Sequence, residues 1–285
     1  MSIGILISVH DGIVLAADSA STLTLTQPGQ APNPQNVALN VYNNANKIAN
    51  LYKGCPIGCV AYGAGSIGNA SISTLLKDFR YRITNVQEPA FDTRAYTMEG
   101  VGTLLTDFLM THVNLLPGNL PKPSLGILLG GYSSGKSLGE GWMIQIEKGV
   151  SKQPVLLRKE DQVGITWGGE SEAVSRLILG FSPHFPTALR SAINPKPSQQ
   201  VLDQLTAHLR NNLQAPIVFA PMPIQDTIDL AEFLVHTAIM FSRFTPGPPS
   251  VGGPIEIAAI TKHEGFKWIR RKHYYSREFN LEPAP

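Results

Sequence analysis

Residues 2–22, SIGILISVHDGIVLAADSAST, decide the fold that we expect for this chain. Residues 3–8 form an apolar, partly β-branched run, and residues 13–17 form a second one. The polar sequence His-Asp-Gly at 10–12 separates them and is typical of a tight turn. The stretch therefore predicts a β-hairpin whose first strand begins at the N-terminus of the chain.

Outward from this hairpin, the pattern predicts further strands and helices. Short apolar or β-branched runs predict strands, and apolar residues three or four positions apart predict amphipathic helices. The predicted strands are 22–26, 47–51, 57–61, 125–131, 142–147, 155–157, 162–167 and 255–261. The predicted helices are one from residue 69, one around 101–109, and those at 170–179, 199–213 and 227–244. Because strands and helices come in blocks and do not alternate strictly, we expect an α+β fold in which antiparallel sheets are layered with helices.

Composition excludes several classes of protein. The 285 residues correspond to one large domain or two modest ones, and a net charge of +2 gives no strong field toward nucleic acid or an anionic membrane. Charged residues make up only 15% of the chain, which favours surface hidden between copies of the protein. Two cysteines, no long apolar run and no basic leader predict a cytoplasmic protein in a reducing compartment.

Two other motifs are expected to have a structural role only. GGYSSGKS at 130–137 has the letters of a phosphate-binding loop, but the Leu-Gly-Glu-Gly-Trp that follows cannot open the helix that such a loop needs. We therefore predict a hairpin loop there. Cys55 and Cys59 have no second cysteine pair to complete a zinc site, so buried thiols and no metal are expected.

The N-terminus offers a more specific chemistry. Removal of Met1 would leave Ser2 with a hydroxyl and a free α-amine on the same residue. An α-amine titrates near 7.7 to 8.0, so part of it is neutral at cytoplasmic pH and can accept the hydroxyl proton. Ser2 would then be both the nucleophile and its own general base.

The segment 2–22 resembles the first strands of proteasome β-type subunits, which belong to the N-terminal-nucleophile (Ntn) hydrolases. Ser2 falls on the nucleophile, Asp11-Gly12 on the turn, and the sequence Ala-Ala-Asp at 16–18 on the acidic motif. Further resemblances follow in order along the chain: NKI at 46–48, AGSIGNA at 64–70, LGILLGG at 125–131, WMIQIE at 142–147, 164–172, and GGPIEI at 252–257. Together they cover most of residues 2–180 and 227–267.

The resemblance implies one domain, residues 2–267, folded as a four-layer α-β-β-α sandwich with two antiparallel sheets. It leaves unmatched a loop near 27–40, an insertion at 181–223 and a basic, then polar C-terminal tail at 268–285. Within 27–40, residues 27–35 are rich in Pro, Gln and Asn and predict a loop.

The resemblance also implies the roles of six residues. Ser2 would be the nucleophile, Lys47 an ammonium that lowers the pKa of its hydroxyl, and Asp18 the partner that orients Lys47. The backbone N–H of Gly65 would stabilise the oxyanion. Thr22 and Ile67 would line the channel in which a peptide adds as an extended strand.

Two family motifs are changed in this chain. The serine of the family's G-S-G-S turn is replaced by Gly169 or Glu170, and the segment 244–250 lacks the aspartate of the R-D-x-x-S-G motif. Ser171 and Ser250 remain as substitutes for these groups. The nucleophile itself is serine where the family usually has threonine.

The function implied is hydrolysis of peptides or unfolded proteins in a homo-oligomeric ring, without cofactor or metal. Whether an ATPase unfoldase serves this ring is left open. Two alternatives stay open, namely an Ntn amidase that acts on a small amide, and a non-catalytic structural subunit of a ring, which the two changed motifs favour.

Overall fold

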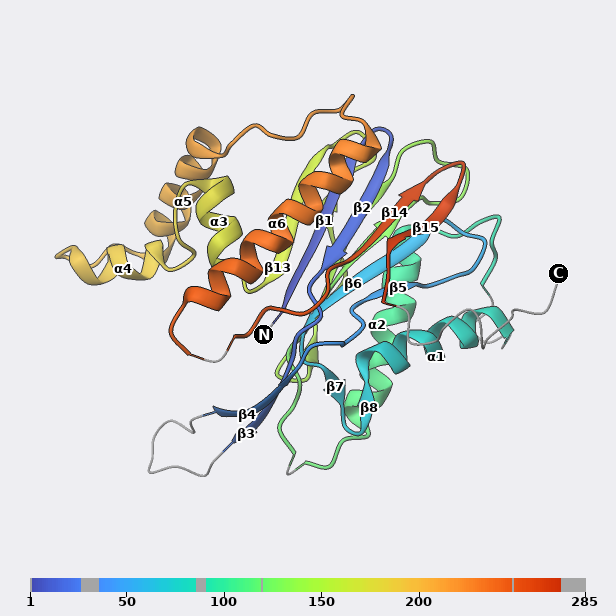
Figure 1. Cartoon of the computed structure of the whole chain (residues 1–285), viewed down its shortest axis with the longest axis horizontal. Coiled ribbons are helices and arrows are strands. Elements are labelled where there is room, and N and C mark those ends of the chain that lie inside the picture. The colour runs from blue at the N-terminus through green and yellow to red at the C-terminus, as the bar shows by residue number, and fades with distance from the viewer. Residues whose placement is uncertain (1, 27–35, 86–90, 119, 248, 273–285) are drawn as a thin grey trace.

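The structure is a computed structural model, and it describes residues 2–26, 36–85, 91–118, 120–247 and 249–272. This part of the chain has an α+β fold whose strands pair antiparallel, as the sequence predicts (Figure 1). Two large sheets lie face to face, with helices on their outer faces. The candidate site lies at one end of the first sheet, where the chain begins.

The first sheet has the strand order β13-β1-β2-β14-β15. Its strands are β1 (Ile3–Val9), β2 (Gly12–Ala17), β13 (Gly164–Gly169), β14 (Glu256–Thr261) and β15 (Gly265–Arg270). The predicted hairpin is confirmed: β1 and β2 pair from Val9↔Gly12 to Gly4↔Ala17 around a tight turn. Every residue of β1 and β2 is buried, which is why both read as continuous apolar runs.

The second sheet has the order β11-β10-β9-β6-β5, and β12 also pairs with β10. Its strands are β5 (Ile48–Asn50), β6 (Ile57–Gly63), β9 (Leu125–Gly131), β10 (Glu140–Glu147), β11 (Val150–Ser151) and β12 (Val155–Arg158). Residues 132–139 connect β9 to β10 as a hairpin, and no helix follows the GGYSSGKS stretch. The prediction of a hairpin loop there is confirmed.

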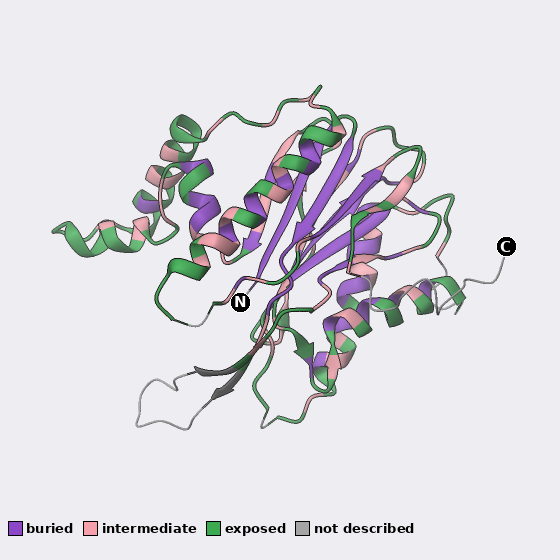
Figure 2. Cartoon of the chain, viewed as in Figure 1, coloured by how far each residue is buried: buried purple, intermediate pink, exposed green. Residues whose placement is uncertain are grey.

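Three apolar clusters hold the layers together. Between the sheets, Leu6 and Leu15 contact Val60 and Leu128 from the opposite sheet. Ile5 points the other way, toward helices α3 (Glu172–Leu179) and α6 (Ile224–Phe244), because successive residues of a strand face opposite sides. Helices α1 (Ile72–Asn85) and α2 (Met98–Asn114) cover the outer face of the second sheet. Figure 2 shows the sheets buried between the helices.

The remaining elements lie outside these layers. Strands β3 (Ser21–Thr26) and β4 (Asn36–Tyr42) form a separate hairpin, and β7 (Ser66–Ile67) pairs with β8 (Ala70–Ser71) just before α1. Helices α4 (Phe185–Ala192) and α5 (Gln199–Leu213) extend from the sheet edge beside α3 (Figure 1). Both helices lie within the predicted insertion 181–223. Leu202 is the only buried residue of these two helices.

Three local expectations need correction or lie outside the described residues. The sequence missed α4, β4, β15 and the two-residue strands β7, β8 and β11. The tail predicted from residue 268 begins inside β15, because this strand runs to Arg270 and pairs with β14. The loop predicted at 27–35 lies outside the described residues, and so do residues 273–285 of the tail.

Candidate functional site

A cavity of about 370 Å³ opens at the start of β1. Four of the six predicted site residues line it: Ser2, Thr22, Lys47 and Gly65. The other lining residues come from the start of β3, the turn before β5, the end of β6, β8 and the start of α1: Ala20, Ser21, Asn44, Ala45, Asn46, Ala61, Tyr62, Gly63, Ala64, Ser71, Ile72, Ser73, Thr74 and Lys77. The fold therefore brings four residues, distributed over 64 positions of sequence, to one cavity.

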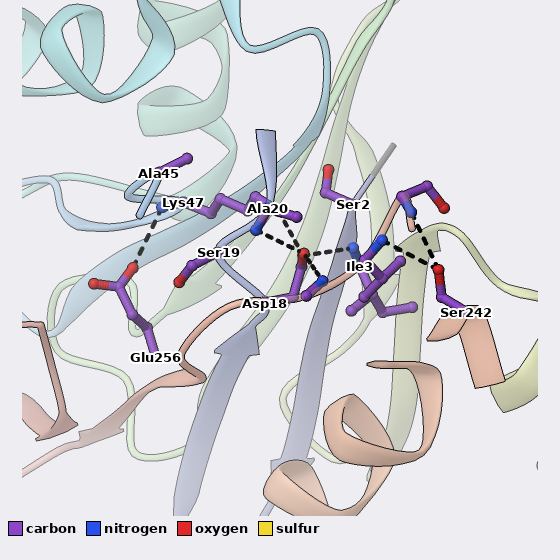
Figure 3. Close-up of polar contacts among 12 residues, drawn as sticks. Ser2, Ile3, Asp18, Ser19, Ala20, Ala45, Lys47, Ser242 and Glu256 are labelled. Carbon is purple, nitrogen blue, oxygen red and sulfur yellow. Dashed lines mark hydrogen bonds and ion pairs between the residues drawn. The ribbon is translucent and has the colours of Figure 1, made fainter. Parts of the chain in front are cut away.

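Asp18 does not itself line this cavity, but its carboxylate ties four chain segments together (Figure 3). Its carboxylate is fully buried and accepts the backbone N–H of Ile3, Ala20 and Gly252, each at 3.0 Å. It also accepts the Lys47 ammonium at 2.5 Å. A buried carboxylate with this many hydrogen-bond donors is held in one orientation.

Lys47 enters the cavity from the chain just before β5. It is 8% exposed, and Asp18 is its ion-pair partner. Burial lowers the pKa of Lys47 from its usual value, and the adjacent Asp18 carboxylate opposes this shift by stabilising the charged ammonium. The result is a lysine held by a fixed partner at the wall of the Ser2 cavity.

Ser2 is held by the edge strand of the sheet and by the end of β6. Its side chain is almost fully buried, and its hydroxyl oxygen accepts the backbone N–H of Gly63 at 3.3 Å. Its carbonyl oxygen accepts the N–H of Glu170 at 2.8 Å, one step beyond the Ile3↔Gly169 pair of β1 and β13. Both contacts fix the backbone and the hydroxyl of Ser2 relative to the cavity.

Gly169 is required at this position because the Ser2 carbonyl oxygen occupies the space of a side chain. A Cβ at residue 169 would lie 1.8 Å from that oxygen, and the φ of Gly169 is +92°. Gly169→Ala is expected to displace the start of β1 and to lower the free energy of unfolding by at least about 2 kcal/mol more than a matched control.

That control is Gly54→Ala, because Gly54 has φ +94° and no atom within 4 Å of its Cβ position. Gly54→Ala should show the conformational cost alone, roughly 1–2 kcal/mol. Chemical denaturation of both variants measures the difference. Equal destabilisation would show that residue 169 and Ser2 are not in the contact described.

The two residues predicted to line the substrate channel, Thr22 and Ile67, have different surroundings. Thr22 has a buried hydroxyl oxygen that finds no hydrogen-bond partner among the described residues, so this group is available to a molecule in the cavity. Ile67 does not line the cavity: its side chain is buried in the apolar cluster beneath α1 and α2. The amide that reaches the Ser2 hydroxyl is that of Gly63, which sequence reasoning did not identify.

The two serines considered as substitutes for the changed family motifs do not line the Ser2 cavity. Ser171 lines a different cavity, between β13 and the helices of the insertion. The backbone N–H of Ser250 donates to the hydroxyl of Ser242 at 3.2 Å. Strand β13 ends at Gly169, opposite Ile3, and the next residue, Glu170, donates its N–H to the Ser2 carbonyl, so neither residue brings a hydroxyl next to Ser2.

A second buried ion pair supports the first, and sequence reasoning missed it. Glu256 is 1% exposed and accepts the backbone N–H of Lys47 at 3.4 Å and the Lys272 ammonium at 3.4 Å. Lys272 also donates to the Ser19 hydroxyl and to the Ala45 carbonyl. The sequence did contain a signal for this pair, namely a glutamate between two isoleucines in a predicted strand. A glutamate at such a buried position needs a positively charged or hydrogen-bonding partner.

The described residues contain no cluster of side chains suited to a metal ion. Cys55 and Cys59 are buried free thiols, and burial raises the pKa of Cys59 to about 12, which makes it a poor nucleophile and ligand. The part of the chain that the structure describes has no helix with the length and apolar character of a membrane span.

Comparison with known proteins adds no family assignment. A scan against models of protein families and a search of curated proteins both returned no match.

Proposed function

We propose that this protein is an N-terminal-nucleophile amide or peptide hydrolase, in which Ser2 attacks the substrate after removal of Met1. The observation that carries the proposal is the placement of Ser2 at the start of β1, in a cavity that it shares with Lys47, whose ammonium is held by Asp18. We propose further that the helix-sheet-sheet-helix arrangement is the Ntn-hydrolase sandwich, which the resemblance of residues 2–22 to proteasome β subunits implies.

The reaction uses groups of the chain alone. The Ser2 oxygen bonds to the carbonyl carbon of the amide, and its proton moves to the α-amine of the same residue. This amine then gives the proton to the leaving nitrogen as the carbon–nitrogen bond breaks, which leaves an acyl ester on Ser2. A water molecule, deprotonated by the same amine, hydrolyses the ester and frees Ser2.

Lys47 and the backbone amides have electrostatic roles in this scheme. The Lys47 ammonium favours the ionised form of the Ser2 hydroxyl, and Asp18 keeps it in place. Gly63 and Gly65 line the cavity, and we assign to their backbone N–H groups the stabilisation of the negative charge that develops on the carbonyl oxygen. We assign substrate binding to the Thr22 hydroxyl, because it is buried without a hydrogen-bond partner among the described residues.

The substrate that we favour is an extended peptide or unfolded protein, acted on inside a homo-oligomeric ring, as in the family that the sequence resembles. A small amide is the second candidate, because a cavity of about 370 Å³ is at the small end of the range for ligand pockets. A non-catalytic ring subunit is the third, and the absence of a hydroxyl at Gly169 favours it.

Two buried lysines provide a matched test of the proposal. Both Lys47 and Lys272 are paired with a buried acid, but only Lys47 lines the Ser2 cavity. Lys47→Met is expected to lower kcat/KM for amide hydrolysis by about 10²-fold or more, the usual cost of a lost electrostatic or proton-transfer group. Lys272→Met is expected to lose stability while each folded molecule keeps most of its activity.

The measurement is kcat/KM on a panel of fluorogenic peptides and small amides, corrected for the folded fraction. Equal activity losses in the two variants would show that Lys47 acts through the fold alone and would contradict its proposed role. Comparing kcat/KM for peptides with kcat/KM for small amides decides between a peptide hydrolase and an amidase that acts on a small amide.

A further inference from the structure

A second and larger cavity, of about 640 Å³, lies between the edge of the first sheet and helices α3, α4 and α5. Its floor is formed by β12 and β13, and its walls by residues of the three helices, which lie together beyond β13 in Figure 1. Tyr62 lines both this cavity and the Ser2 cavity. The proposed reaction of Ser2 assigns no role to this second space.

The charges around the second cavity have one sign. Arg158 and Arg210 line it, and none of the described residues lining it is acidic. Neither arginine forms an ion pair with a described residue. Burial lowers the pKa of Arg158, and the nearby positive charge of Arg210 lowers it further, so an anion beside Arg158 would stabilise its charged form.

The side chain of Arg158 is held in place by hydrogen bonds to the backbone. Its two terminal nitrogens donate to the carbonyl oxygens of Leu157 and Ile165, at 2.9 and 3.0 Å. Its Nε is buried and has no hydrogen-bond partner among the described residues. A guanidinium has five N–H donors, so this group keeps donors to spare for an anion.

The rest of the cavity is suited to an apolar body with a few polar contacts. Trp167, Phe181 and Leu179 supply apolar surface, while Thr166 and Thr206 supply hydroxyl groups. A volume of about 640 Å³ is within the range of pockets for drug-sized ligands. Guanidinium groups pair with carboxylates through two parallel hydrogen bonds.

We propose that this cavity binds an organic carboxylate with an apolar body, whose carboxylate lies between Arg158 and Arg210. The same chemistry occurs in a free aromatic or aliphatic acid and in the C-terminus of a peptide. The site is separate from the proposed chemistry of Ser2, so it does not depend on whether Ser2 is a nucleophile.

The test uses 4-phenylbutyrate and its amide, which differ in charge and have nearly the same shape. Binding to the full chain is measured by calorimetry and by tryptophan fluorescence, since Trp167 lines the cavity. The carboxylate is expected to bind at least tenfold more tightly than the amide. N-acetyl-Leu-Phe, with a free or an amidated C-terminus, tests in the same way whether the cavity binds the C-terminal carboxylate of a peptide.

Three variants locate the site. Arg210→Gln is expected to weaken binding of 4-phenylbutyrate at least tenfold without harm to the fold, because Arg210 is exposed and has no described ion pair. Arg158→Gln is expected to weaken binding similarly, but it also removes two contacts to the backbone. Arg190→Gln, on α4 and outside the cavity lining, is the control and is expected to bind as the wild type does.

Equal binding of the acid and the amide would overturn the proposal, and so would unchanged affinity in Arg210→Gln. Inorganic phosphate binding as tightly as 4-phenylbutyrate would overturn the assignment of an apolar ligand. Loss of binding in Arg190→Gln would place the site elsewhere on the insertion.

Discussion

Ser2→Ala is expected to abolish both amide turnover and covalent labelling by an electrophilic peptide inhibitor, while the fold is nearly unchanged. The nucleophilic oxygen is lost, and no other atom of the cavity can replace it in the proposed scheme. The folded state loses one hydrogen bond, from the Gly63 N–H at 3.3 Å, which costs about 1 kcal/mol. Activity assays, labelling and thermal unfolding measure the three effects.

Ser21→Ala is the matched control, because this serine lines the same cavity and has no proposed role in the chemistry. It is expected to keep turnover and labelling. Ser2→Thr should retain or raise peptide hydrolysis, since it restores the usual nucleophile of the family that the sequence resembles. If wild type and Ser2→Thr are both inert across about pH 6 to 9, where the α-amine titrates, the non-catalytic reading replaces ours.

Asp18→Ala is expected to give the largest loss of stability of any substitution at the site. It leaves three backbone N–H groups without their acceptor and the buried Lys47 ammonium without its counter-ion. Removing one partner of a buried ion pair costs roughly 3–5 kcal/mol. Chemical denaturation should therefore show a free energy of unfolding lowered by about this amount.

The double variant Asp18→Asn with Lys47→Met separates charge from hydrogen bonding. It removes both charges and keeps one acceptor, so it is expected to be more stable than Asp18→Ala. Glu147→Ala breaks the exposed pair with Lys152 and is expected to change stability by less than about 1 kcal/mol. A loss in Asp18→Ala no larger than in Glu147→Ala would contradict the buried network.

The sequence predicts the parts of the fold in which local pattern and burial agree. Both strands of the first hairpin are buried along their whole length, so their apolar runs and the polar turn between them suffice to locate both strands. β15 was missed because it carries Lys267 and Arg270 on an edge strand, where charged side chains reach solvent and resemble a polar tail. α4 was missed because no residue of it is buried, which leaves no apolar stripe to detect.

The sequence predicts those parts of the candidate site that consist of side chains matching the motifs of the family that it resembles. The structure pairs Asp18 with Lys47, as the resemblance implied, although 29 positions separate them. The Gly63 amide was not predictable, because a backbone N–H leaves no trace in residue type. Lys272 was not predictable as the partner of Glu256, because their pairing depends on where the chain turns after β15.

The intact mass of the purified protein, before and after reaction with a peptide epoxyketone, tests the central claim most directly. A hydroxyl and a free α-amine on one residue can both bond to this reagent, so it reports on the proposed nucleophile and base together. We predict the mass of the chain without Met1, and one added inhibitor in the wild type that is absent in Ser2→Ala. Retained Met1, an acetylated Ser2, or an adduct that persists in Ser2→Ala would contradict the account.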